Sequence, residues 1–253
     1  MVIDFDKLFE QFLMDKLNTD LKGKPADEVE RMIPDLYKEW QNKSIAKYGY
    51  SPKDYFEKLK AENKCGEYIK ACIDNSLDIS DMILDFISES DVDLLIEILD
   101  NENYAGYAAS IIKETGTHKA DEKLIDIVNT SEDENLVELA VEILSDNHEE
   151  IVEKLLNTIS DKDVKIQERY MDILYNYKGR EEILDWLIVM LNRNIDTILY
   201  ASYIGSYGME EAVDELIDYL KKNDTDKYEF AEIRNAVERL GGEIPEELAK
   251  ETL

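Results

Sequence analysis

The sequence predicts an all-α protein, a right-handed α-solenoid of about five to six helical hairpins that is preceded by an N-terminal helical cap. Two observations support this prediction: a leucine-centred phrase recurs about every thirty residues, and a second helical segment lies between successive phrases. One pair of helices cannot bury its own apolar stripe, but stacked pairs bury it against one another, so such a period is typical of elongated helical arrays. We therefore expect a cap over residues 1–77 and a repeat array over residues 78–253.

The recurring phrase has the apolar spacing of an α-helix. It reads LIEILD, LIDIVN, LLNTIS, LIVMLN and LIDYLK, and it begins at Leu95, Leu124, Leu155, Leu187 and Leu216. Counted from that leucine, apolar residues recur at positions minus three, zero, plus one and plus four, which form one stripe at about 3.6 residues per turn. Only Asp121 interrupts the stripe. Position plus two is mostly acidic or polar, so we expect the opposite face to meet water.

A second helical segment follows each phrase. These segments span about 104–115, 135–145, 164–177, 195–207 and 228–240. The residues at their ends tolerate the left-handed conformation that terminates a helix, and they are Gly116, Asn147, Gly179, Gly208 and Gly241. Each phrase and the segment after it therefore predict one antiparallel pair of helices.

Residues 1–77 lack the phrase and are rich in aromatic side chains. An apolar stripe predicts a first helix over about 4–18. Pro25 and Pro34 are each expected to begin a further short helix, because proline is favoured in the first turn. Ser51 predicts the start of another helix, since its hydroxyl is followed by a proline and an acid.

The segments 67–74 and 80–88 have the spacing of a degenerate opening repeat. We interpret residues 1–77 as a cap that covers the first exposed stripe, as terminal units of an array must. An independent binding module is the alternative interpretation of this part of the chain.

The stretch 201–220 reads ASYIGSYGMEEAVDELIDYL, in which a small residue, an apolar-Gly-x-x-Gly turn and an Ala-Val-x-x-Leu-Ile-x-x-Leu helix follow one another. This wording resembles the short HEAT-like repeats named after phycobilisome lyases. The likeness rests on Ile204, Gly205, Gly208, Ala212, Val213, Leu216, Ile217 and Leu220. It extends over about two thirds of the chain, but the family's frequent Arg-rich second helix is missing. The resemblance implies an architecture more than an activity, because these repeats serve many binding proteins and a few enzymes.

The net charge of −30 is unevenly distributed, with about −2 over residues 1–77 and about −28 over residues 78–253. Nucleic acid is an improbable partner of the repeats, because phosphate backbones are bound chiefly by Lys and Arg. A basic protein or peptide is the natural inference from this charge. The alternative is that the acids only solvate the outer helices.

No catalytic, cofactor-binding or metal-binding residues are expected. Phosphate-cradling, dinucleotide and nucleophile-elbow motifs are absent from the sequence, and the only histidines, His118 and His148, each fall in a turn. Cys65 and Cys72 are expected to be half-buried apolar residues without a disulfide. The chain has neither an apolar run of eighteen residues nor a signal-like start, so we expect a cytoplasmic protein with no membrane partner.

Tyrosine is the remaining unusual feature. Five tyrosines recur at corresponding places in successive second helices or lie between them, and they are Tyr170, Tyr177, Tyr200, Tyr203 and Tyr207. In related arrays the second helices line the concave side, so these rings are candidates for contact with a partner. The spacing of Tyr200 and Tyr207 also fits one buried stripe, which we favour.

The leading hypothesis is a non-enzymatic scaffold that binds a basic protein or peptide on an acidic solenoid surface. An acidic decoy that imitates phosphates, as a toxin-neutralising or DNA-mimicking protein would, is the alternative, motivated by the acidic column Glu97, Asp126 and Asp218. An enzyme that resembles the HEAT-like DNA glycosylases or the bilin lyases is less favoured. Asp185 and Trp186 are adjacent but have few cations around them.

Overall fold

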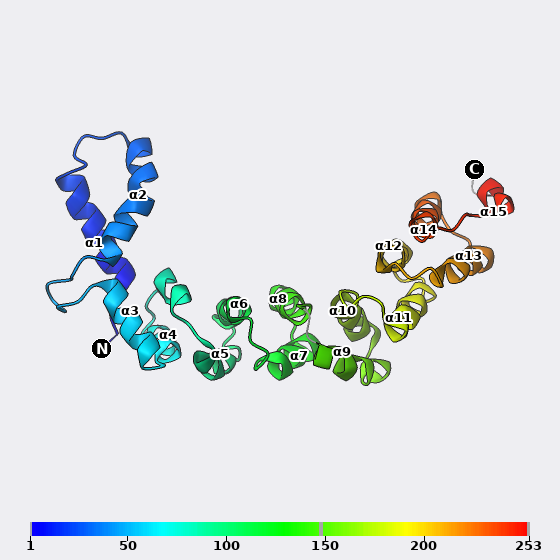
Figure 1. Ribbon diagram of the computed structural model, residues 1–253, viewed down its shortest axis with the longest axis horizontal. Helices are drawn as coiled ribbons and strands as arrows, with labels where there is room; N and C mark the ends of the chain where they lie inside the picture. The colour runs from blue at the N-terminus through cyan, green and yellow to red at the C-terminus, as the bar shows by residue number, and fades with distance from the viewer. Residues whose placement is uncertain (1, 147–148, 252–253) are drawn as a thin grey trace. The chain divides into compact units, whose positions relative to one another are not determined.

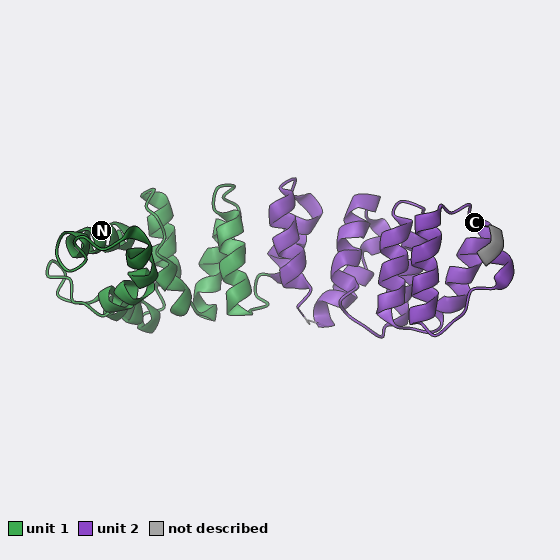
Figure 2. Ribbon diagram, turned by 90° about the horizontal axis from the view of Figure 1, so that it is seen from above, with its two compact units in different colours: residues 1–120 green, residues 121–253 purple. Residues whose placement is uncertain are grey.

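The computed structural model describes residues 2–146 and 149–251, and within these ranges every regular element is helical. The all-α class is therefore confirmed. The chain divides into two compact units, Met1–Ala120 (unit 1) and Asp121–Leu253 (unit 2), shown in Figure 2. The boundary that we expected between the cap and the repeat array, after residue 77, lies inside unit 1. It remains a prediction. None of the described helices combines the length and the apolar character needed to cross a bilayer.

Unit 1 begins with aromatic-rich helices and ends with the first helix pair. Its elements are α1 (Phe5–Asn18), α2 (Ala26–Gln41), α3 (Pro52–Ala61), α4 (Cys65–Asp74), the 3-10 helices η1 (Asp81–Asp85) and η2 (Glu89–Asp91), α5 (Val92–Ile98) and α6 (Ala105–Thr115). The expected starts are confirmed at Asp4, whose carboxylate accepts from the Lys7 amide at 2.9 Å, and at Ser51, which forms a capping box with Asp54. The segment 80–88 contains 3-10 turns in place of a full α-helix.

The two short helices expected to begin at Pro25 and Pro34 form one helix, α2, with Pro34 in its interior. A proline there removes one backbone hydrogen bond and costs about 3 kcal/mol. Buried aromatic contacts keep the helix continuous across this point, because Trp40 packs against Phe9 with ring centroids 5.1 Å apart. The separate helix starting at Pro34 was therefore a wrong prediction.

Unit 2 consists of successive helix pairs. Its elements are α7 (Asp121–Thr130), α8 (Glu134–Leu144), α9 (Glu149–Leu156), η3 (Ile159–Asp161), α10 (Val164–Leu174), α11 (Glu181–Leu191), α12 (Thr197–Tyr207), α13 (Ala212–Lys222), α14 (Lys227–Arg239) and α15 (Glu246–Glu251). Figure 1 shows α7, α9, α11 and α13 in one row, which we call the first row, and α8, α10, α12 and α14 in another, the second row. The predicted pairing of each phrase with the following segment is confirmed.

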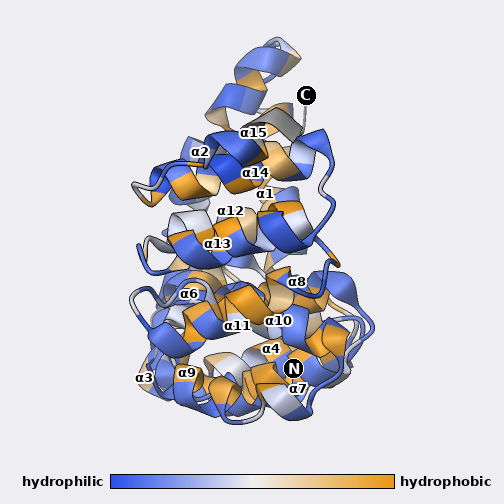
Figure 3. Ribbon diagram, turned by 90° about the vertical axis from the view of Figure 1, so that its right-hand side faces the viewer, coloured by the Kyte–Doolittle hydropathy of each residue, from blue (hydrophilic) through white to orange (hydrophobic). Residues whose placement is uncertain are grey.

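The stripe leucines are buried in the cores of the two units. Leu95, Leu124, Leu155, Leu187 and Leu216 each have 0% of their surface exposed. The residues two positions later in the first four phrases, Glu97, Asp126, Asn157 and Val189, are exposed. In Figure 3, α11 and α13 accordingly carry both hydrophilic and hydrophobic stretches. The amphipathic pattern predicted from the sequence is confirmed at these positions.

Glycine has two functions in the packing. Gly116 and Gly208 end α6 and α12 in the left-handed conformation, with φ of 61° and 87°. Gly205 lets α12 and α14 approach closely, because a Cβ added to Gly205 would lie 2.7 Å from Ala236 Cα. Asn147, expected to end another second helix, lies outside the described residues.

Replacing a stripe leucine should destabilise unit 2 far more than replacing an exposed neighbour. Leu187→Ala is expected to lower the unfolding free energy by about 2–5 kcal/mol, because it leaves a cavity in a fully buried site. The control on the same helix is Val189→Ala, at a side chain that is 41% exposed, for which we expect a change within about 0.5 kcal/mol. Urea unfolding followed by circular dichroism measures both. Equal losses in the two variants would contradict the packing described here.

Candidate protein-binding surface

Four of the five candidate tyrosines are buried in unit 2. Tyr170, Tyr177, Tyr200 and Tyr207 each expose 4% or less of their surface. Three of their hydroxyls bind groups that lie 30 to 41 residues earlier in the chain. Tyr170 donates to Asn129 Oδ1 at 3.0 Å, Tyr177 to the Leu144 carbonyl at 2.7 Å, and Tyr207 to the Tyr177 carbonyl at 2.7 Å. These side chains join neighbouring helix pairs, as the buried-stripe interpretation of their spacing anticipates.

Tyr203 is only partly buried, and it stacks on Tyr175, which the sequence analysis did not single out. The two rings are nearly parallel, at 14°, with centroids 4.1 Å apart. Lys178 Nζ lies 3.4 Å from the Tyr175 ring centroid, and the Tyr203 hydroxyl donates to Asp172 Oδ1 at 3.0 Å. Tyr175 lies 28 residues before Tyr203, which is close to the repeat length. This spacing could have identified Tyr175 from the sequence.

A groove of about 500 Å³ lies between α8 and α10, and we call it the α8–α10 groove. It is lined by Glu134, Val137, Glu138, Val141, Glu142 and Ser145 from α8 and its C-cap, and by Arg169, Asp172 and Asn176 from α10 and the turn after it. The three glutamates are spaced four residues apart and therefore share one face of α8. The lining thus combines two valines with four carboxylates and one guanidinium.

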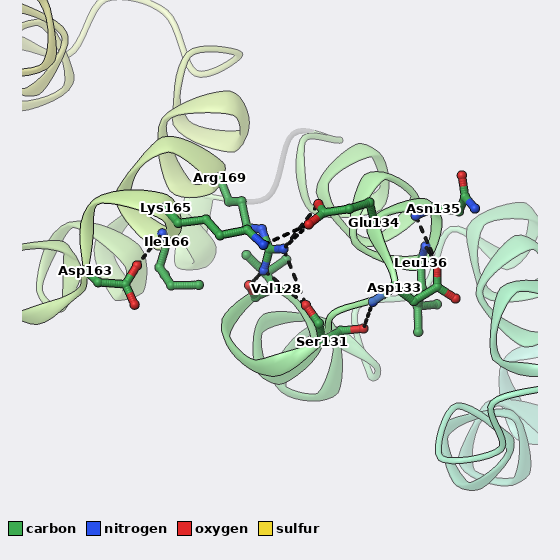
Figure 4. A network of polar contacts seen from close by, with 10 residues as sticks. All are labelled: Val128, Ser131, Asp133, Glu134, Asn135, Leu136, Asp163, Lys165, Ile166 and Arg169. Atoms are coloured by element: carbon green, nitrogen blue, oxygen red, sulfur yellow. Dashed lines mark hydrogen bonds and ion pairs between the residues drawn. The ribbon is translucent and has the colours of Figure 1, made fainter. Parts of the chain in front are cut away.

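The guanidinium of Arg169 is occupied by contacts within unit 2, as Figure 4 shows. Its side chain is 9% exposed, and Nη1 donates to the Val128 carbonyl at 2.7 Å. Nη2 donates to both carboxylate oxygens of Glu134 at 3.1 and 3.2 Å. Arg169 therefore fixes the start of α8 against α7 and α10.

Glu134 is held ionised by its neighbours. A hydrogen bond from Lys165 has the largest effect and lowers the pKa of Glu134; burial opposes it, and the charge of Arg169 and its hydrogen bond lower the pKa further. This end of the α8–α10 groove is thus closed by ion pairs. Glu138, one turn further along α8, is exposed and forms no ion pair with any described residue.

Asp172 joins the groove to the tyrosine stack. Burial raises the pKa of Asp172, the Tyr203 hydrogen bond lowers it, and the Glu168 carboxylate raises it. A cation that approaches a desolvated carboxylate stabilises its ionised form. For Asp172 the positive charge offsets both the cost of burial and the repulsion from Glu168. The surface formed by the groove and the Tyr175–Tyr203 stack is therefore suited to a cationic group with an apolar stem.

The remaining residues considered in the sequence analysis lie elsewhere. Cys65 and Cys72 are buried and free, and burial raises the pKa of the Cys65 thiol to about 12, which disfavours the reactive thiolate. Asp185 is exposed on α11 in the first row. His118 lines a depression in unit 1, whereas His148 lies outside the described residues. Within the described ranges, no three His, Cys, Asp or Glu side chains are placed to hold a metal ion.

A scan of the chain against models of known protein families gave no match, and a search of curated protein sequences gave none either.

Asp172 should make stability depend on pH in a defined direction. Its folded-state pKa is raised, so its contribution favours folding at low pH and is lost as pH rises from about 4, the ordinary value for aspartate. Asp172→Asn keeps an oxygen that accepts from Tyr203. Because asparagine does not ionise, the variant does not lose stability at this position as pH rises. The variant's unfolding free energy relative to the native chain should therefore increase with pH above about 4 and then level off.

Urea unfolding between about pH 3 and pH 7 measures this difference. Asp185→Asn is the matched control, because it removes the same charge from an exposed position on α11. A pH-independent difference for Asp172→Asn, or the same curve for both variants, would contradict the environment described for Asp172.

Proposed function

We propose that this protein is a non-enzymatic scaffold that binds a basic protein or peptide in the α8–α10 groove and on the adjoining Tyr175–Tyr203 stack. The proposal retains the architecture expected from the sequence, a right-handed α-solenoid of HEAT-like repeats, with the second-row helices as the binding side. It also retains the cytoplasmic location. The observation that supports the binding role most is that four carboxylates and two valines line one groove beside the Tyr175–Tyr203 stack.

The chemistry of the groove fits lysine and arginine side chains. Their ammonium and guanidinium groups are hydrogen-bond donors that pair with carboxylates, and their alkyl stems pack on apolar surface such as Val137 and Val141. Tyrosine rings attract the same cations through their faces, as Lys178 already does on Tyr175. A volume of about 500 Å³ lies within the range of ligand pockets, about 300–1,000 Å³, and accommodates several side chains.

The acidic decoy needs rows of carboxylates that are available to a partner. The three acids that motivated this alternative each form an ion pair within the chain. Glu97 pairs with Lys70 at 2.7 Å, Asp126 with Lys123 at 3.7 Å and Asp218 with Lys221 at 2.9 Å. Exposed pairs of this kind are weak, so they do not exclude the decoy. The α8–α10 groove favours the peptide-binding function instead.

The proposal is tested by calorimetric titration with a short peptide of alternating arginine and alanine. We expect saturable binding that weakens when salt is raised from about 0.01 M to about 0.1 M, because the Debye length falls from about 30 Å to about 10 Å. An analogue with citrulline in place of arginine has the same shape without the charge, and it should bind much more weakly.

The double variant Glu138→Gln with Glu142→Gln should lose about tenfold in affinity for the arginine peptide, which corresponds to about 1.4 kcal/mol. The matched control is Asp214→Asn with Glu215→Gln, which removes the same charge from exposed positions on the first-row helix α13. Binding of the citrulline peptide as tight as that of the arginine peptide would contradict the proposal. Equal losses in the two double variants would also contradict it, because they would indicate attraction by net charge alone.

A further inference from the structure

The connection between α2 and α3, residues 42–51, differs in charge from the rest of the chain, and we call it the 42–51 loop. It carries Lys43 and Lys47 and no acid, and the acid-free stretch extends over residues 40–53. Both lysines are exposed. Figure 1 shows the connection projecting from the side of α2 and α3. The loop therefore presents positive charge on a protein whose net charge is −30.

The two lysines of the 42–51 loop have no carboxylate partner among the described residues, although the chain holds 59 acids and only 29 Lys and Arg. Lys43 Nζ lies 5.0 Å from the ring centroid of Phe12, and Lys47 Nζ lies 5.1 Å from that of Tyr48. Lys70, also exposed in unit 1, instead pairs with an acid of α5 at 2.7 Å. The ammonium groups of the loop are thus open to carboxylates of a partner.

The 42–51 loop has a fixed shape. The Ile45 amide donates to the Tyr50 carbonyl at 2.9 Å, and the Gly49 amide donates to the Ile45 carbonyl at 2.8 Å. The partly exposed rings of Tyr48, Tyr50 and Tyr55 stack in sequence, with centroids 6.0 and 5.6 Å apart and interplanar angles of 23° and 20°. Because the loop is held in one conformation, less conformational entropy is lost when it binds.

The α8–α10 groove has the complementary properties. Four carboxylates line it, and Glu138 forms no ion pair with any described residue. Val137 and Val141 supply apolar surface on which the alkyl stems of lysines pack. The volume of about 500 Å³ accommodates more than one side chain. An acid-free loop with two exposed lysines and partly exposed tyrosine rings therefore matches the groove in charge and in chemistry.

We propose that the 42–51 loop of one copy of this chain binds in the α8–α10 groove of a second copy. This inference rests on the proposed function, because it names the basic partner of that groove. The loop and the groove are different surfaces, so each copy offers one of each and the contact is head-to-tail. The repulsion between two acidic chains is screened beyond about 8 Å at about 0.15 M salt, whereas the lysines and carboxylates meet at shorter range.

Sedimentation of the full chain at about 0.15 M salt tests the inference over a wide range of protein concentration. We expect the average mass to rise above that of one copy as the concentration increases, since a head-to-tail contact leaves a free loop and a free groove at the ends. The peptide of alternating arginine and alanine should return the protein to single copies, because it occupies the groove.

Charge reversal identifies the two surfaces. The loop variant Lys43→Glu with Lys47→Glu and the groove variant Glu138→Lys with Glu142→Lys should each weaken self-association by at least about tenfold, because like charges then face each other. An equal mixture of the two variants should associate again, since each loop then meets a groove of opposite charge. Both variants remain acidic overall, so attraction by net charge does not explain this recovery.

Lys22→Glu with Lys24→Glu is the matched control, since it reverses two exposed lysines on the connection between α1 and α2. It should change self-association by less than about twofold. Circular dichroism checks that every variant keeps the native helix content.

Three results would overturn the inference: a single copy at every concentration, equal losses in the control and the loop variant, or folded loop and groove variants that do not associate when mixed. If the arginine peptide binds a chain that stays a single copy, the proposed function is retained and this inference alone is rejected. Self-association that the bound peptide does not reverse would place the contact elsewhere and reject it too. Failure of the peptide to bind contradicts the proposed function itself.

Discussion

The structure depends on one constraint: a pair of short amphipathic helices cannot bury its apolar stripe unless another pair packs against it. The leucines at the centre of the five first helices are all fully buried, and the hydroxyls of Tyr177 and Tyr207 reach backbone groups about thirty residues away. Packing therefore requires the repeat period to be kept, whereas the outward faces are free to vary. The exposed acids of the second row, such as Glu138, and the partly exposed rings of Tyr175 and Tyr203 lie on these less constrained faces.

Much of the fold was predictable because its causes are local. Apolar spacing located both helices of every pair, and the glycine at 208 marked a helix end correctly. The continuity of α2 across Pro34 was not predictable in the same way, because it depends on Trp40 packing against a ring of α1. The candidate site was predictable only in part. The tyrosine spacing was visible, but which ring stays exposed depends on partners in neighbouring repeats, as for Tyr203 on Tyr175.

The charge of the chain sets what its surface can bind. With 29 Lys and Arg against 59 Asp and Glu, one-to-one pairing leaves at least 30 carboxylates without an internal cation. Arg169 is used inside unit 2, where it binds two backbone carbonyls and Glu134. The surplus acids are not equivalent, because a carboxylate beside aromatic rings is partly desolvated and is stabilised more by a cation than a fully hydrated one is. This difference distinguishes Asp172, which lines the α8–α10 groove and accepts from Tyr203, from the general acidity.

Hydroxyl-radical footprinting with and without the arginine peptide tests most directly whether the peptide binds at the α8–α10 groove and the Tyr175–Tyr203 stack. The tyrosine stack adjoins the α8–α10 groove, whereas Tyr228, at the start of α14, is 64% exposed and serves as the internal reference. The account predicts that the bound peptide lowers the oxidation of Tyr175 and Tyr203 and leaves that of Tyr228 unchanged. Unchanged oxidation of Tyr175 and Tyr203 at saturating peptide would contradict it.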